Sequence, residues 1–265
     1  MLISEPLKEV DPYLEDAGIA VPAEDEKFNP YHSPTTGEFS SGGGGAGAGH
    51  PVGSVPYEEG HPGDMSQASK ILFGKELNEE EWKKMVGAPP GSTLKIDYAD
   101  YKSNAKKSED MASIKVMVKG GGIEDMGLYY SASGSGKKSI YIDVLSLGKT
   151  GTGEGTRITQ SIIEEGRVKG FTEISLTAAK GYNPQANIYF NGQYTWARLG
   201  WNADAPKNNP FGAKDLNELM STKEGRNYWK EKAGGNRLTN LKMKFDLNPN
   251  STSSKIFDAY IKAKR

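Results

Sequence analysis

The stretch from Ser139 to Ala178 constrains the fold of this chain more than any other part of the sequence. An apolar run, Ile140 to Leu145, is followed by three glycines at alternate positions, then by a segment with helical periodicity and a second short apolar run. Strand, glycine loop, helix and strand in this order predict a parallel crossover unit. The backbone N–H groups of a glycine loop and of the helix N-terminus that follows it can bind an anion. We therefore expect any phosphorylated ligand to bind here.

Composition and charge exclude several classes of function. The chain has 265 residues, no cysteine and a net charge of −1. Without cysteine there is no disulfide, no thiolate metal ligand and no cysteine nucleophile. The small net charge predicts no general attraction to nucleic acid or to anionic membranes. No apolar run approaches the ~20 residues that a membrane span requires, and the acidic N-terminus does not resemble a secretory signal. We therefore expect no secretion of the chain.

Residues 1–65 are expected to form a tail. Pro, Gly, Ser and acidic residues dominate them, and residues 40–49 read SSGGGGAGAG, which is typical of a flexible linker. Such a segment cannot bury enough apolar surface to offset its chain entropy, so we expect it to be flexible or held by a partner. The sequence FNPYHSP from Phe28, followed by GEFS from Gly37, resembles a segment of tailed-phage structural and head-morphogenesis proteins. This resemblance implies association with a virion, so we expect the protein to be cytoplasmic or virion-associated. An ordinary disordered leader is the alternative interpretation of the segment.

Periodicity predicts the elements on either side of the crossover unit. A helix over about 66–86, with Asn78 able to cap its second part, precedes alternating runs near residues 94–98, 114–118 and 126–130. An antiparallel meander that leads into a crossover favours an α+β mixed sheet over a doubly wound one. We expect a domain over residues 66–205. We also expect a C-terminal extension over residues 206–265, with two helices and one strand, packed on that domain.

Two phosphate-binding motifs fit the glycine loop poorly. Gly148 to Thr150 reads GKT, but the P-loop motif needs a glycine where this chain has Asp143, inside the predicted strand. In the dinucleotide fingerprint the last glycine falls on Thr156, and the acidic partner falls on Glu173, at the start of a strand rather than at its end.

A third motif fits better. Residues 150–155 read TGTGEG, which resembles the coenzyme A loop (Q/R-x-x-G-x-G/A) of the GCN5-related N-acetyltransferase (GNAT) superfamily, except that Thr150 stands where that family has Gln or Arg. Leu199-Gly200-Trp201 is similar to the family's L-G-F. The resemblance covers residues 66–205 and includes the order of the elements. It implies a GNAT-like mixed sheet flanked by helices and acetyl-CoA as co-substrate.

The resemblance implies a coenzyme site around the loop. In the family the strand before the loop pairs with the pantetheine arm. The loop glycines let backbone N–H groups approach a pyrophosphate, and flanking basic side chains can reach its oxygens. A tight strand-to-helix turn is the alternative role for the glycines. The expected binding residues are Val144, Leu145, Ser146, Lys149, Gly151, Gly153, Gly155, Thr156 and Arg157.

The catalytic residues are less well defined. All three histidines lie before residue 65, so the expected base is a carboxylate. Asp143 on the central strand is the first candidate, with Glu124 and Asp125 as alternatives. The family's acid is a tyrosine, but Trp196 stands at that position and has no transferable proton. Tyr194 is the candidate substitute. Solvent exposure for Asp143 and core packing for Tyr194 are the alternative interpretations.

Two functions from different classes follow. The first is an acetyl-CoA-dependent N-acetyltransferase-like protein with an unknown amine acceptor. The second is a non-enzymatic virion or assembly protein that uses a GNAT-like fold as a module and contacts other virion proteins through its tail and its C-terminal extension. A small basic cluster, Lys102, Lys106 and Lys107, has no interleaved aromatic residues. Nucleic-acid binding is therefore not expected.

Overall fold

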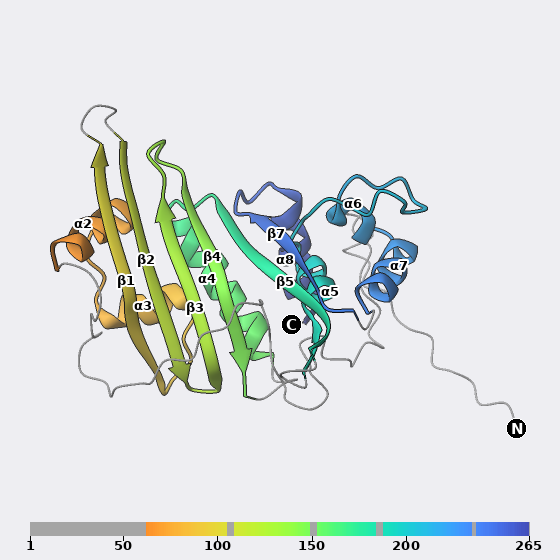
Figure 1. Ribbon diagram of the computed structural model, residues 1–265, viewed down its shortest axis with the longest axis horizontal. Helices are drawn as coiled ribbons and strands as arrows, with labels where there is room; N and C mark the ends of the chain where they lie inside the picture. The colour runs from red at the N-terminus through yellow and green to blue at the C-terminus, as the bar shows by residue number, and fades with distance from the viewer. Residues whose placement is uncertain (1–61, 105–108, 149–152, 184–187, 235–236, 265) are drawn as a thin grey trace, which may run out of the picture.

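The computed structural model describes residues 62–264 apart from 105–108, 149–152, 184–187 and 235–236. Residues 1–61 of the expected tail lie outside this part of the chain. The described elements, in chain order (Figure 1), are α2 (Pro62–Phe73), α3 (Glu79–Val86), β1 (Ser92–Asn104), β2 (Glu109–Gly120), β3 (Ile123–Ala132), β4 (Lys138–Leu147), α4 (Glu154–Val168), β5 (Glu173–Asn183), β6 (Ile188–Asn191), α5 (Gly192–Arg198), α6 (Leu216–Met220), α7 (Lys223–Ala233), β7 (Thr239–Asp246) and α8 (Thr252–Lys264).

Two helices, α2 and α3, replace the single helix expected over residues 66–86. The chain turns at Gly74, which has φ +79° and follows the last residue of α2. Asn78 then caps α3: its Oδ1 accepts from the Glu81 N–H at 2.9 Å, and its own N–H donates to Glu81 Oε2 at 3.2 Å. This reciprocal capping starts a new helix rather than continuing the first.

The sheet is mixed, as the sequence predicts. Six of its seven strands follow the order β1-β2-β3-β4-β5-β6, and the seventh, β7, pairs with β5. The first four strands form an antiparallel meander, and β4 and β5 are parallel and joined by α4. The expected crossover unit and the expected α+β class are therefore confirmed.

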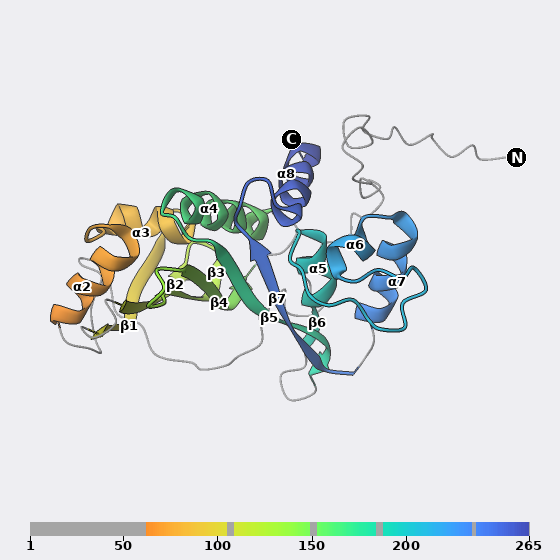
Figure 2. The same ribbon diagram turned by 90° about the horizontal axis from the view of Figure 1, so that it is seen from above.

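Helices cover one face of this sheet. Figure 2 shows α2, α3, α4 and α8 on the same side of the strands. An aromatic cluster fills the space under α2 and α3, with ring centroids 5.1 Å apart for Phe73 and Trp82 and 5.6 Å apart for Phe73 and Tyr130. The Tyr130 hydroxyl donates to the Met85 carbonyl at 3.2 Å, so the one polar atom of this fully buried side chain is satisfied.

The C-terminal residues belong to the same sheet and the same core. Strand β7 pairs antiparallel with β5 from Glu173↔Asp246 to Lys180↔Thr239. Phe245 on β7 lies against Trp201, with ring centroids 4.6 Å apart. Residues 206–265 therefore form part of the sheet itself, because they supply the strand that pairs with β5.

Candidate functional site

The parallel strands β4 and β5 separate soon after they begin. They pair over only four positions, from Ser139↔Glu173 to Ile142↔Leu176, although β4 continues to Leu147 and β5 to Asn183. Figure 1 shows the two strands diverging beyond this point. We call this divergence the fork. On its β5 side, the backbone of residues 144–147 is paired with no described strand.

A β-bulge coincides with the opening of the fork. Leu128 on β3 pairs with Ile142 and Gly127 pairs with Val144, which leaves Asp143 as the extra residue of β4. Burial follows the bulge: Ile142 is buried before it and Leu145 after it, so the alternation shifts by one residue. A bulge bends the strand and increases its twist, which accounts for β4 turning away from β5.

Gly127 is the residue that accommodates the bulge. A Cβ atom there would lie 3.1 Å from Met117 Sδ, 3.4 Å from Val144 Cγ1 and 3.5 Å from Asp143 Cβ. Only the contact with Met117 Sδ, from β2, is closer than an ordinary van der Waals contact, so an alanine at position 127 would displace the Met117 side chain.

The predicted coenzyme loop is described only from Gly153 onward. Lys149 and Gly151 lie outside the described residues. Gly153 is the N-cap of α4 with φ +76°, and the first turn of α4 receives no hydrogen bond from a capping side chain. The main chain continues into the helix with the Arg157 N–H donating to the Gly153 carbonyl at 3.0 Å. The N–H groups of this first turn are therefore positioned to face an external acceptor.

Charged side chains at the start of α4 pair with each other. Arg157 Nη2 lies 2.6 Å from Glu154 Oε1, its Nε lies 3.2 Å from Glu154 Oε2, and Nη2 also donates to the Gly87 carbonyl at 3.3 Å. The hydrogen bonds to Glu154 raise the pKa of Arg157. To bind a phosphate as expected, Arg157 would have to give up its hydrogen bonds to Glu154. Gly155 is buried and Thr156 half-buried in the same turn.

The side chains of Leu145 and Ser146 on β4 are engaged within the protein, so a ligand in the fork would contact mainly the β4 backbone. Leu145 is buried in the core, and Val144 is half-buried. Ser146 is 8% exposed, and its hydroxyl donates to Glu124 Oε2 at 3.0 Å. Asp125, the other alternative base, pairs with Ser146 in the strand register, and its Oδ1 is buried without a hydrogen-bond partner.

Asp143 belongs to a polar cluster on the face opposite the helices. Lys115 Nζ lies 3.7 Å from Asp143 Oδ2, 3.4 Å from Asp97 Oδ2 and 5.1 Å from the centre of the Tyr129 ring. Burial would lower the pKa of Lys115, but its interactions with Tyr129 and Asp97 outweigh burial and raise it. The expected base is thus beside a lysine that holds its charge.

Tyr194 lies in a different environment from Asp143. It is 3% exposed on α5, a helix whose residues are all buried and which packs against β5, β7, α6 and α7. Trp196 on the same helix lies against Trp201, with ring centroids 4.7 Å apart. The structure therefore places the two expected catalytic residues in different parts of the fold, one on the strand face and one in the core.

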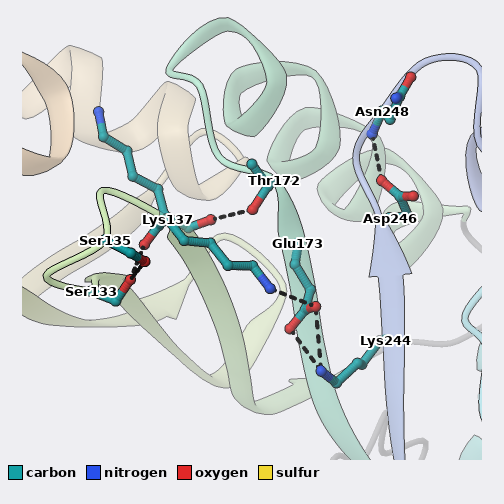
Figure 3. A network of polar contacts seen from close by, with 9 residues as sticks. Ser133, Ser135, Lys137, Thr172, Glu173, Lys244, Asp246 and Asn248 are labelled. Atoms are coloured by element: carbon teal, nitrogen blue, oxygen red, sulfur yellow. Dashed lines mark hydrogen bonds and ion pairs between the residues drawn. The ribbon is translucent and has the colours of Figure 1, made fainter.

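Ion pairs between side chains stabilise the end of the fork where β4 and β5 are still paired. Figure 3 shows Glu173, the first residue of β5, between Lys137 and Lys244, with each lysine Nζ 3.3 Å from its carboxylate. Thr172 Oγ1 also donates to the Lys138 carbonyl at 3.0 Å. Sequence reasoning missed these residues and Lys115, because contacts between strands depend on a register that alternation alone does not define.

Comparisons of the chain with models of known families, with curated proteins and with solved structures found no match. In the described part of the chain, no three His, Asp or Glu side chains are grouped so that they could hold a metal ion. Within the same residues, none of the helices combines the length and apolar character that crossing a membrane requires.

Proposed function

We propose that this chain is an acetyl-CoA-binding protein of GNAT-like architecture, with the coenzyme placed across the fork. One observation carries the proposal: β4 loses its parallel partner after Ile142, at the bulge of Asp143, and residues 144–147, which pair with no described strand on that side, lead toward the N-terminus of α4. An extended chain that carries amide groups can hydrogen-bond to such an edge as an added strand would. A pyrophosphate linked to that chain reaches the N–H groups of α4.

The geometry supports binding better than turnover. In an acetyl transfer the amine nitrogen attacks the thioester carbonyl, a base takes the ammonium proton, and the thiolate of coenzyme A leaves. Asp143 is a carboxylate at the point where the fork opens, and Lys115 forms an ion pair with it. Tyr194, the candidate acid, is buried in α5. The acceptor amine would have to compete with Lys115 for Asp143.

Calorimetry with acetyl-CoA tests the proposal, with free coenzyme A as competitor. Gly153→Glu should reduce affinity by more than about tenfold, because it places a carboxylate where the pyrophosphate binds. Gly153→Ala is the matched control: no atom lies within 4 Å of a Cβ there, so it introduces only the strain of φ +76°. Absence of heat with the wild-type chain, or equal losses in both variants, would contradict the proposal.

A virion or assembly role is the second candidate. The observation that favours it is the contribution of the C-terminal region to the central sheet through β7, with α6, α7 and α8 around it. This region is a fixed part of the fold and offers surface for partners. Mass spectrometry of purified particles from the source of the chain tests this role, and absence of the chain from them argues against it.

A further inference from the structure

Charge is distributed unevenly along the chain. Residues 1–27 contain eight acidic residues and two lysines, a net charge of −6. Because the whole chain has a net charge of −1, residues 28–265 carry +5. Apolar residues, among them Leu7, Val10, Tyr13 and Leu14, alternate with the acidic ones. A segment of this composition complements a surface that is both basic and aromatic.

One group of basic side chains on the described surface has no carboxylate partner and lies beside exposed aromatic rings. Many lysines have an acidic partner, as Lys137 and Lys244 have in Glu173. Lys180 at the end of β5 instead donates to the carbonyl of Lys232 in the last turn of α7. Burial and the charge of Lys232 lower the pKa of Lys180. Two like charges are thus held together at this end of the sheet.

Arg237 adds a third charge. Its carbonyl oxygen would lie 2.3 Å from a Cβ added to Gly181, so the backbone of Arg237 crosses β5 next to Lys180. Among the described residues, no carboxylate forms an ion pair with Lys180, Lys232 or Arg237. The C-terminus of α7 accounts for the positions of Lys180 and Lys232, since a cation is favourable there, but it does not account for Arg237.

Aromatic rings continue this surface along α7. Lys232 Nζ lies 5.5 Å from the centre of the Tyr228 ring, and the Phe211 ring meets Tyr228 edge-to-face at 5.8 Å. Phe211 is 46% exposed. Asn209 fixes the loop that presents it, because its side chain both donates to the Ala213 carbonyl at 2.8 Å and accepts from the Ala213 N–H at 3.0 Å. Exposed aromatic rings on a fixed loop are typical anchors of an interface.

We propose that the acidic segment of residues 1–27 binds the basic aromatic surface formed by Lys180, Phe211, Tyr228, Lys232 and Arg237. Its carboxylates pair with the cations, and its apolar side chains cover the rings. Figure 1 places α7 at the far end of the sheet from β1. The 34 residues from 28 to 61 can span about 110 Å when extended, well beyond the radius of gyration of about 17 Å expected for ~200 residues. The segment can therefore reach the surface from its own chain or from a neighbouring copy.

Photo-crosslinking of the full chain tests this proposal. Tyr13 is replaced by the photoreactive p-benzoylphenylalanine, and crosslinked peptides are identified by mass spectrometry. We expect the products to fall on α7, on residues 207–213 and on the end of β5, and their yield to decrease as salt rises from about 50 to about 500 mM. In an equimolar mixture of heavy and light chains, mixed products indicate binding between copies and unmixed products binding within one chain. Mixed and unmixed products alike would place the acidic segment on this surface.

Variants define the role of charge. Lys232→Gln with Arg237→Gln should lower the crosslink yield by about tenfold, since exposed ion pairs contribute at most about fivefold each. The matched control is Lys255→Gln, an exposed lysine on α8, which should leave the yield unchanged. The proposal is overturned if the crosslinks fall mainly on β1 to β4, or if the double variant leaves them unchanged. It is also overturned if the yield of these crosslinks does not change between about 50 and about 500 mM salt, because binding through ion pairs is screened by salt.

Discussion

The hydroxyl of Tyr141 on β4 lies 3.3 Å from Oγ1 of Thr177 on β5. Thr177 is the first residue of β5 after the last backbone pair of the two strands, Ile142↔Leu176. Side chains thus continue the contact between β4 and β5 where the backbones have separated. The fork opens above this hydrogen bond, and Glu173 with its two lysines holds the strands together below it. The start of the divergence is therefore fixed on both sides.

A double-mutant cycle measures this contact. Tyr141→Phe and Thr177→Val should each lower the free energy of unfolding by about 1 kcal/mol, and the double variant should lose less than the sum, because the hydrogen bond is shared. Urea denaturation of the four proteins gives the coupling energy. Simple additivity would show that the hydrogen bond makes no contribution to stability.

Lys138 should stabilise two helices at once. Its Nζ donates to the carbonyl of Leu72 at the end of α2 at 2.9 Å and lies 3.5 Å from the carbonyl of Lys169 at the end of α4. A cation is favourable at both helix ends, so Lys138→Met should lower the free energy of unfolding by about 1–2 kcal/mol. Lys70→Met, an exposed lysine in the last turn of α2, is the control in the same denaturation experiment and should cost less.

Acid should weaken the start of α3. Hydrogen bonds from Lys75 and from the Asn78 backbone lower the pKa of Glu81 below its usual 4.5. A carboxylate with a lowered pKa stabilises the fold above its unfolded pKa, and this contribution is lost as the pH falls through the folded pKa. The stability difference between wild type and Glu81→Gln should therefore be constant near neutral pH and disappear in acid. A difference that persists at the lowest pH would contradict this assignment.

Alanine substitutions at two glycines should distinguish the cost of backbone strain from the cost of steric overlap. Gly170 and Gly200 both have positive φ, but only Gly200 is crowded: a Cβ there would lie 2.5 Å from the Ser253 carbonyl oxygen, whereas no atom lies within 4 Å at Gly170. Gly170→Ala should cost about 1–2 kcal/mol. Gly200→Ala should cost several kcal/mol because α8 must also move. Thermal unfolding compares them, and equal losses would show that α8 can move at little cost.

Much of the fold follows from local sequence, but the site follows only in part. Alternation predicts the meander, and the glycines before an apolar helix predict the crossover, since both signals lie within one or two elements. The break at Gly74 was missed because the apolar pattern continues across it. The cluster around Lys115 was missed because it requires the register of four strands, which the bulge at Asp143 shifts by one residue. Pairing of β7 beside β5 is a contact between distant segments, and periodicity contains no information about it.

Under the proposed function, Glu154 limits coenzyme affinity. Its carboxylate lies in the first turn of α4, where it opposes a bound pyrophosphate, and it pairs with Arg157 at 2.6 Å. Glu154→Gln removes one negative charge and releases Arg157 for the phosphates. We expect acetyl-CoA affinity to rise by about fivefold, because a charge at a helix N-terminus contributes up to about 1 kcal/mol. Glu164→Gln, farther along the same helix, is the control and should leave affinity unchanged. If the wild-type chain binds acetyl-CoA and Glu154→Gln does not strengthen binding, the pyrophosphate does not bind at the N-terminus of α4.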